Sequence, residues 1–341
     1  MTIDRCICPG LRVSAKCIAS LSLQTLLLLV ACKPERVPLG PPPPEAHWEV
    51  DSLRVDCASD LWSVNDVWVR PDGALVAIVS GRRVVTYRQN QWECVYVREG
   101  GLAALWADDS HIFAVGDTAI GEFTVHELVV HYDGAQWNES VLGNPGGLHT
   151  LTCVWGRSRT KVYAGGYFGA RWAFDGSTWV SMTQSGSSVE TSIHGNDQLV
   201  IMAGEYNDQV AYRECMLSVQ TEPDGIFVNE TCAGEERIID VIALDGDHAV
   251  AIGINQVLER TPAGIWEPMS IVGGGNSVWG TDIENVFVAG GSTILHYDGH
   301  EWTPFSSPVA WSVRMLAGTS LSTLVAFGDS NAEYMRYVVP R

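Results

Sequence analysis

The sequence of 341 residues predicts an all-β protein built from repeated four-stranded units, and three observations lead to this prediction. The chain contains 34 Gly and 13 Trp but only 18% charged residues, which is typical of many short strands joined by tight turns. No long segment spaces its apolar residues as a helix does. Nearly the same motif occurs twice, as VVHYDGAQW in residues 129–137 and as ILHYDGHEW in residues 294–302, which indicates an internal repeat.

The clearest repeat units carry a Val-Trp-Gly segment, then a short apolar segment, and then an Asp-Gly pair followed by a second Trp; the other units keep part of this pattern. The two tryptophans are 24 residues apart in one unit (Trp155 to Trp179) and 23 apart in another (Trp279 to Trp302). The first tryptophan, or the residue expected in its place, gives seven anchors: Trp68, Trp106, Trp155, His194, Ala243, Trp279 and Ala317.

The unit that ends with the second motif shows how each repeat divides into strands. Its four segments are SVWG (277–280), VFVAG (286–290), TILHYDG (293–299) and EWTPF (301–305). Alternating β-branched and aromatic residues suit packed strands, and Asp-Gly suits a tight hairpin because Gly accepts a positive φ. Four strands repeated about every 40 residues are typical of a β-propeller blade. We therefore predict a seven-bladed β-propeller over residues 47–341, with six or eight blades as alternatives.

The two ends of this domain complement each other. The last unit, which begins at Ala317, stops after its third strand, whereas residues 47–53 (HWEVDSL) read as a fourth-type strand with no unit before it. We expect this N-terminal strand to close the last blade, which would remove two exposed sheet edges. The first strand of each blade should then line the axis, and the second-Trp strand should lie outermost.

The N-terminus predicts export and lipidation. Residues 1–31 combine basic residues with an apolar segment, as a signal peptide does. Residues 29–32 (LVAC) resemble a bacterial lipobox, so Cys32 would carry the lipid; a plain signal peptide or a short anchor helix is the alternative. Lys33 after the cysteine favours the outer membrane, on its periplasmic or cell-surface side. The prolines of residues 32–46 predict an extended linker.

The charge balance excludes some classes of partner. Without residues 1–31 the chain keeps 18 basic and 39 acidic residues, a formal charge of −21. Nucleic-acid binding and electrostatic adhesion to anionic lipids both require basic surfaces. We therefore expect no nucleic-acid partner and a membrane link through the lipid alone.

Five cysteines follow the lipobox, and an oxidising compartment would pair them. The segment between Cys215 and Cys232 has hairpin length, and Cys57 with Cys94 is a second, weaker pairing, which leaves Cys153 buried and free. No Cys-x-x-Cys or His-x-x-x-His spacing occurs, so we expect neither a metal site nor a cofactor.

No catalytic constellation stands out in the sequence. Asp133, Asp175 and Asp298 precede Gly at equivalent positions of different blades, which favours turn chemistry over paired carboxylate catalysis. His131 and His296 are likewise equivalent repeat positions. The recurring tryptophans fit packing between blades better than a sugar-binding platform. We therefore expect no enzyme.

Irregular loops are the remaining candidates for a binding site. The strand order places residues 116–127, 165–172 and 204–209, from three consecutive blades, on one face of the ring. Aromatic residues and Arg are typical of recognition hot spots, although drift in tolerant loops would give the same pattern. The candidate binding residues are Phe123, Tyr167, Phe168, Arg171, Glu205, Tyr206 and Asp208.

The set of Val-Trp-Gly, NVFVAGG or HIFAVGD, HYDG and Trp resembles the repeats of envelope lipoproteins common in myxobacteria and related bacteria. Those proteins are regarded as propellers akin to Kelch or WD40 rings. The resemblance implies the propeller architecture over residues 48–341 and little about chemistry. Our prediction is a lipid-anchored, monomeric binding or scaffold module whose partner is a protein or glycan of the cell envelope. A propeller-type glycan lyase or hydrolase, and a purely structural envelope protein, are the alternatives.

Overall fold

The computed structural model describes most of residues 46–339. The described ranges are 46–55, 57, 63–119, 125–143, 150–182, 188–207, 213–221, 225–232, 236–269, 273–329 and 333–339. The predicted signal peptide, Cys32, most of the linker, Phe123 and Asp208 lie outside these ranges. The described residues belong to one compact unit, Pro44–Arg341.

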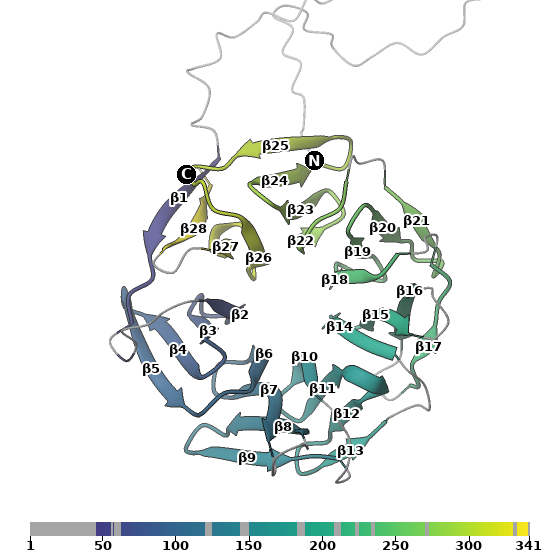
Figure 1. The fold of residues 1–341 in the computed structure, drawn as a ribbon. Helices are drawn as coiled ribbons and strands as arrows, with labels where there is room; N and C mark the ends of the chain where they lie inside the picture. The colour runs from purple at the N-terminus through teal and green to yellow at the C-terminus, as the bar shows by residue number, and fades with distance from the viewer. Residues whose placement is uncertain are drawn as a thin grey trace, which may run out of the picture. The chain divides into compact units, whose positions relative to one another are not determined.

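Seven antiparallel sheets of four strands each form a ring, which confirms the predicted seven-bladed β-propeller (Figure 1). In every blade the first strand lies at the axis and the fourth at the rim, as the repeat predicts. Blades 1 and 2 consist, from the axis outward, of β2 (Val64–Val69), β3 (Leu75–Val79), β4 (Arg83–Arg88) and β5 (Gln91–Val97), and of β6 (Leu102–Ala107), β7 (Ile112–Ala119), β8 (Val125–Tyr132) and β9 (Trp137–Val141).

Blades 3 and 4 carry the candidate loops. Their strands are β10 (Leu151–Ser158), β11 (Lys161–Gly166), β12 (Arg171–Phe174) and β13 (Trp179–Ser181), and β14 (Ser188–Gly195), β15 (Val200–Asn207), β16 (Arg213–Gln220) and β17 (Val228–Asn229). A short 3-10 turn, η1 (Tyr167–Gly169), joins β11 to β12.

Blades 5, 6 and 7 complete the ring. The strands of blades 5 and 6 are β18 (Ile238–Ala243), β19 (Ala249–Gly253), β20 (Val257–Arg260) and β21 (Trp266–Pro268), and β22 (Ser277–Asp282), β23 (Asn285–Gly290), β24 (Thr293–Tyr297) and β25 (Trp302–Ser306). Blade 7 contains β26 (Val313–Ala317), the 3-10 turn η2 (Leu321–Thr323), β27 (Val325–Gly328), β28 (Glu333–Val338) and, outermost, β1 (His47–Ser52).

The N-terminal strand closes blade 7, as predicted from the two chain ends. β1 runs antiparallel to β28, with Trp48 opposite Tyr337 (Figure 1). The rings of these two residues lie 5.2 Å apart, and both side chains are buried. The closing strand therefore contributes a core side chain as well as backbone hydrogen bonds.

The core lies between the blades. The second strands are mainly apolar, and every residue of β3 and of β19 is buried. Because neighbouring blades cover both faces of each sheet, β3 and β19 are continuous apolar runs, whereas the rim strands β5 and β9 are mostly exposed or partly exposed.

The register corrects one anchor of the repeat. Ile242 lies opposite Val250 on β19, just as Trp106 lies opposite Phe113 in blade 2. Ile242 therefore occupies the first-tryptophan position of blade 5, and the prediction of Ala243 was wrong by one residue. A unit without this tryptophan offers only the spacing to its second Trp, and both 23 and 24 residues occur in other units.

Candidate functional site

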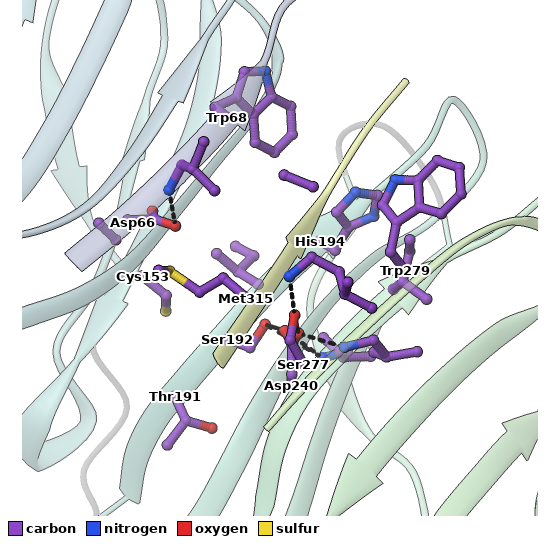
Figure 2. Close-up of a pocket in the computed structure, with 18 of the residues that line it drawn as sticks. Asp66, Trp68, Cys153, Thr191, Ser192, His194, Asp240, Ser277, Trp279 and Met315 are labelled. Carbon is purple, nitrogen blue, oxygen red and sulfur yellow. Dashed lines mark hydrogen bonds between the residues drawn. The ribbon is translucent and has the colours of Figure 1, made fainter. Parts of the chain in front are cut away.

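A cavity of about 280 Å³ lies on the axis of the ring and is lined by the first strands of all seven blades (Figure 2). Two carboxylates, Asp66 and Asp240, face it together with the Ser192 and Ser277 hydroxyls. Asp66 and Asp240 are equivalent residues, because each follows the β-bulge in its own first strand. We call this the axial acceptor position. Its seven occupants are Asp66, Ala104, Cys153, Ser192, Asp240, Ser277 and Met315.

Asp66 joins blade 1 to blade 2. One carboxylate oxygen accepts the Val67 N–H at 2.8 Å, and the other accepts the Leu105 N–H of the next blade at 2.7 Å. Burial raises the pKa of Asp66 to about 7, and these two N–H groups oppose that rise. The carboxyl therefore serves as an acceptor for the wall of the cavity.

Asp240 joins three blades in the same way. Its Oδ1 accepts the Ser192 hydroxyl of blade 4 at 2.7 Å, and its Oδ2 accepts the Val278 N–H of blade 6 at 2.9 Å. The Ser277 hydroxyl also donates to Oδ2, at 3.0 Å. Burial raises the pKa of Asp240, whereas these donors lower it. Both oxygens of this carboxylate are thus bonded to neighbouring blades.

The same arrangement recurs in other blades without a carboxylate. The Ser277 hydroxyl accepts the Leu316 N–H of blade 7 at 3.1 Å. In blade 4, Thr191 lies one residue before Ser192, and its hydroxyl donates to the Ile238 carbonyl of blade 5 at 2.7 Å. The polar groups around the cavity therefore fasten adjacent blades, and sequence reasoning missed them.

The Val-Trp-Gly segments also join blades. The Trp155 ring packs on Gly195 of the next blade, where an added Cβ would lie 2.7 Å from the ring. Trp106 packs on Gly156 in the same way. Trp279 donates its indole N–H to the Gly318 carbonyl of blade 7 at 2.8 Å. The glycine after the tryptophan therefore makes room for the tryptophan of the preceding blade, which supports packing over a sugar platform.

The histidine and tyrosine of the HYDG motif serve the same packing. The His131 ring stacks on Phe113 with centroids 3.9 Å apart, and His296 stacks on Phe287 at 4.3 Å. Burial lowers the pKa of His131 to about 4, so the ring is neutral at pH 7. Tyr132 donates its hydroxyl to the Gly134 carbonyl and so braces the turn.

The aspartate of the motif closes the hairpin turn. Asp133 accepts the N–H groups of Ala135 and Gln136, each at 2.9 Å, and Gly134 has a φ of 92°. Asp298 accepts two N–H groups in the same way. These backbone donors lower the pKa of both carboxyls, so both are ionised turn residues, in agreement with the turn interpretation.

Tyr167 and Phe168 lie at the surface, as predicted. They begin η1, between β11 and β12 of blade 3, and 42% and 52% of their residue surface is exposed. Phe168 has a φ of 60° and a ψ of 33°, the left-handed region that bulky residues avoid. Backbone hydrogen bonds hold the turn: the Ala170 N–H donates to the Tyr167 carbonyl, and the Tyr167 N–H donates to the Thr150 carbonyl.

Arg171 and Glu205 are not available for recognition, so their assignment to the binding surface was wrong. Arg171 is 3% exposed and Glu205 is 6% exposed. The Arg171 Nε donates to Glu190 Oε1 at 2.7 Å, across the seam between blades 3 and 4. Gly165 makes room for Glu190, since a Cβ at that glycine would lie 2.9 Å from the Glu190 Cβ.

Tyr206 belongs to the same network. The Arg171 Nη2 donates to Ser218 Oγ at 3.2 Å, and Ser218 donates in turn to Asn229 Oδ1. The Asn229 amide then donates to the Tyr206 hydroxyl. The structure thus connects the partly exposed Tyr206 to the buried Arg171 through Ser218 and Asn229, and Tyr167 and Phe168 are the most exposed of the candidates it describes.

The cysteines pair as the sequence suggests. Cys57 is bonded to Cys94, with Cα atoms 6.0 Å apart, and Cys215 is bonded to Cys232, with Cα atoms 6.1 Å apart. Cys153 is free and buried, and burial raises the pKa of its thiol. Within the described ranges, no three His, Cys, Asp or Glu side chains are placed to share a metal ion. The described part of the chain also contains no helix that is long and apolar enough to span a membrane.

Comparison with known proteins identifies the fold alone. No family model and no curated protein matches the chain. The chain is similar to the structure of YCF48 bound to D1 peptide, with a TM-score of 0.64 at 14% identity over 86% of this chain and 97% of that one. A streptogramin B lyase gives 0.65 at 9% identity over 85% and 98%, and the WD40 propeller of Doa1 gives 0.65 at 10% over 87% and 98%. These neighbours are propellers.

Proposed function

We propose that the chain is a lipid-anchored β-propeller of the bacterial cell envelope that binds a protein partner through the Tyr167–Phe168 turn of blade 3. The observation that carries this proposal is an exposed Phe held in a left-handed backbone conformation. The structure of YCF48 with a D1 peptide shows a propeller of similar fold that binds a peptide, which supports the choice of a protein partner.

The backbone of Phe168 makes display of its ring the better interpretation. A left-handed conformation costs a non-glycine residue about 1–2 kcal/mol, and Gly169 beside it has a φ of 74°. A ring that is 52% exposed recovers little of this cost by burial. Strain of this kind is concentrated at binding and catalytic sites.

The turn is also preorganised for binding. Two backbone hydrogen bonds close it, and Arg171, the residue at which β12 begins, is fixed by its buried pair with Glu190. A rigid aromatic pair loses little conformational entropy on binding, so more of its contact area contributes to affinity. Tyr and Phe on such a support have the composition of protein-binding hot spots.

We propose that the axial cavity has a structural role and that the chain is not an enzyme. Both carboxylate oxygens of Asp66 accept backbone N–H groups, one of them from blade 2, and both oxygens of Asp240 accept donors from blades 4 and 6. A general acid or base needs a free oxygen directed at a substrate. A propeller-type lyase or hydrolase is the alternative, and catalysis in this cavity would have to break those bonds.

The lipid anchor is tested at Cys32. The full-length chain and the Cys32→Ala variant are expressed with a radiolabelled fatty acid in a bacterial host. We expect label in the native chain and none in the variant, because the thiol is the only attachment point that a lipobox provides. Equal labelling of the two chains would disprove the anchor, and it would leave the binding proposal untouched.

The binding surface is tested by relieving the strain and removing the ring at once. In Phe168→Gly, the glycine adopts the left-handed conformation freely, so we expect an unchanged or slightly higher melting temperature together with loss of the partner. The native chain and the variant are used as baits on solubilised envelopes, and the proteins recovered are quantified by mass spectrometry. A retained protein is then purified and titrated against both baits, with at least a tenfold weaker Kd expected for the variant.

The matched control is Val180→Thr, an exposed residue on the rim strand of the same blade. This control should bind as the native chain does. Equal affinity of Phe168→Gly for every captured protein would rule out the turn as the binding surface. Binding of an immobilised glycan that is lost in Phe168→Gly would replace the protein partner with a carbohydrate.

A further inference from the structure

We propose that the Cys57–Cys94 disulfide is a reducible latch that holds the ring-closing strand β1 in place. The ring is closed inside blade 7, where β1 pairs with β28. The disulfide attaches the chain that leaves β1 to β5, the rim strand of blade 1. Cutting it frees the end of β1 that faces blade 1.

The segment after β1 crosses from blade 7 to blade 1. Leu53 and Val55 are buried, and Val55 pairs with Trp92 of β5 in a parallel bridge. The Trp92 ring meets Tyr334 of β28 edge-on, with centroids 6.0 Å apart. One apolar cluster therefore spans both blades beneath this segment, and the disulfide lies directly beyond it.

The disulfide shortens the tether of β1. Cys57 lies 5 residues after Ser52, the end of β1, whereas Val64, the start of β2, lies 12 residues after it. The effective concentration of a tethered segment falls roughly as the −3/2 power of tether length. On tether length alone, loss of the disulfide lowers the effective concentration of β1 at β28 about fourfold.

At the axis, few hydrogen bonds are available to hold blades 7 and 1 together when the disulfide is reduced. Met315 occupies the axial acceptor position of blade 7, where Ser277 in blade 6 binds the Leu316 N–H. Among the contacts described for β26 and β2, no side chain of one strand bonds to the backbone of the other. The seam is therefore held by the apolar cluster between the two blades and, at the rim, by the disulfide.

The latch is open to thiol chemistry. Cys57 is exposed, whereas Cys94, Cys215 and Cys232 are half-buried against apolar clusters, so the first disulfide alone offers an exposed sulfur. A dithiol reductant attacks Cys57 through a mixed disulfide and leaves as its own disulfide. The Cys57–Cys94 bond takes up two electrons and two protons and becomes two thiols.

Hydrogen exchange of the intact domain, residues 33–341, tests the latch. The native domain is compared with the double variant Cys57→Ser/Cys94→Ser and with the matched control Cys215→Ser/Cys232→Ser. We expect the β28 amides to exchange at least about fourfold faster in the first variant, with the other blades unchanged, and at the native rate in the control. Native protein treated with dithiothreitol after folding provides the same comparison if a variant does not fold.

Two results would overturn the proposal. One is an equal rate of amide exchange in β28 with and without the Cys57–Cys94 bond, which would show that β1 stays paired with β28 without the disulfide. The other is faster exchange in all seven blades on selective reduction of this bond, which would make it a general stabilising bond with no local role at the closure.

Discussion

A chain that lacks residues 46–54 is expected to lose at least about 5 kcal/mol of its free energy of unfolding. The deletion removes the buried side chains of Trp48 and Leu53, each worth about 1.5–3 kcal/mol, and the backbone ladder between β1 and β28. Native domains are stable by only about 5–15 kcal/mol, so this loss is comparable to the total. It also exposes the edge of β28, which invites aggregation.

The measurement is thermal unfolding of purified domains, with light scattering to detect association. Val50→Thr is the matched control, because Val50 lies on the same strand with its side chain exposed, and this variant should melt within a few degrees of the native chain. If the deletion variant has the same melting temperature as the native chain, β1 does not stabilise blade 7 and the ring closes without it.

The ring could be predicted from the sequence because each motif residue of the repeat has a structural role in several blades. The tryptophan of one blade needs the glycine of the next, as Trp106 and Gly156 show. His131 covers the ring of Phe113, and Asp133 closes its turn. A constraint that acts within every blade or between consecutive blades repeats along the chain, and a repeated constraint is visible in one sequence.

The bonds around the axis could not be predicted for the opposite reason. The partner of Asp66 is the backbone N–H of Leu105, which every residue except Pro possesses. The axial acceptor position is filled by Asp, Ala, Cys, Ser or Met, so it leaves no repeated letter in the sequence. Nothing in the sequence therefore distinguishes a blade-joining carboxylate from one that lines a ligand site.

The sequence placed all the candidate residues at the surface, and the structure confirms this for only some of them. Tyr167 and Phe168 are exposed, whereas Arg171, only a few residues further on, points into the seam between two blades. Its partner, Glu190, lies on the first strand of the next blade, 19 residues later in the chain. The same pattern of an Arg beside aromatic residues occurs in exposed recognition loops and at buried ion pairs, because local composition does not reveal burial.

Replacing Arg171 with Met is expected to destabilise the domain by about 3–5 kcal/mol. The substitution leaves the Glu190 carboxylate fully buried with its cationic partner removed, and an uncompensated buried charge has this cost. For a domain of this size, about 1 kcal/mol corresponds to roughly 2–4 °C, so the melting temperature should fall by about 10 °C. Thermal and urea unfolding of the purified domain measure the change.

The double variant Arg171→Met/Glu190→Gln separates two costs of the single substitution: the unpaired charge of Glu190 and the lost packing of the Arg171 side chain. Once Glu190 is neutral, the missing guanidinium matters less, so the double variant should be more stable than Arg171→Met alone, with a coupling free energy above about 1 kcal/mol. Arg336, half-exposed and paired with Asp51 at 3.1 Å, is the control, since Arg336→Met should cost less than about 1 kcal/mol. Equal losses for Arg171→Met and Arg336→Met would show that the pair under the Tyr167–Phe168 turn is solvated. The turn would then lack the rigid support on which its role in binding depends.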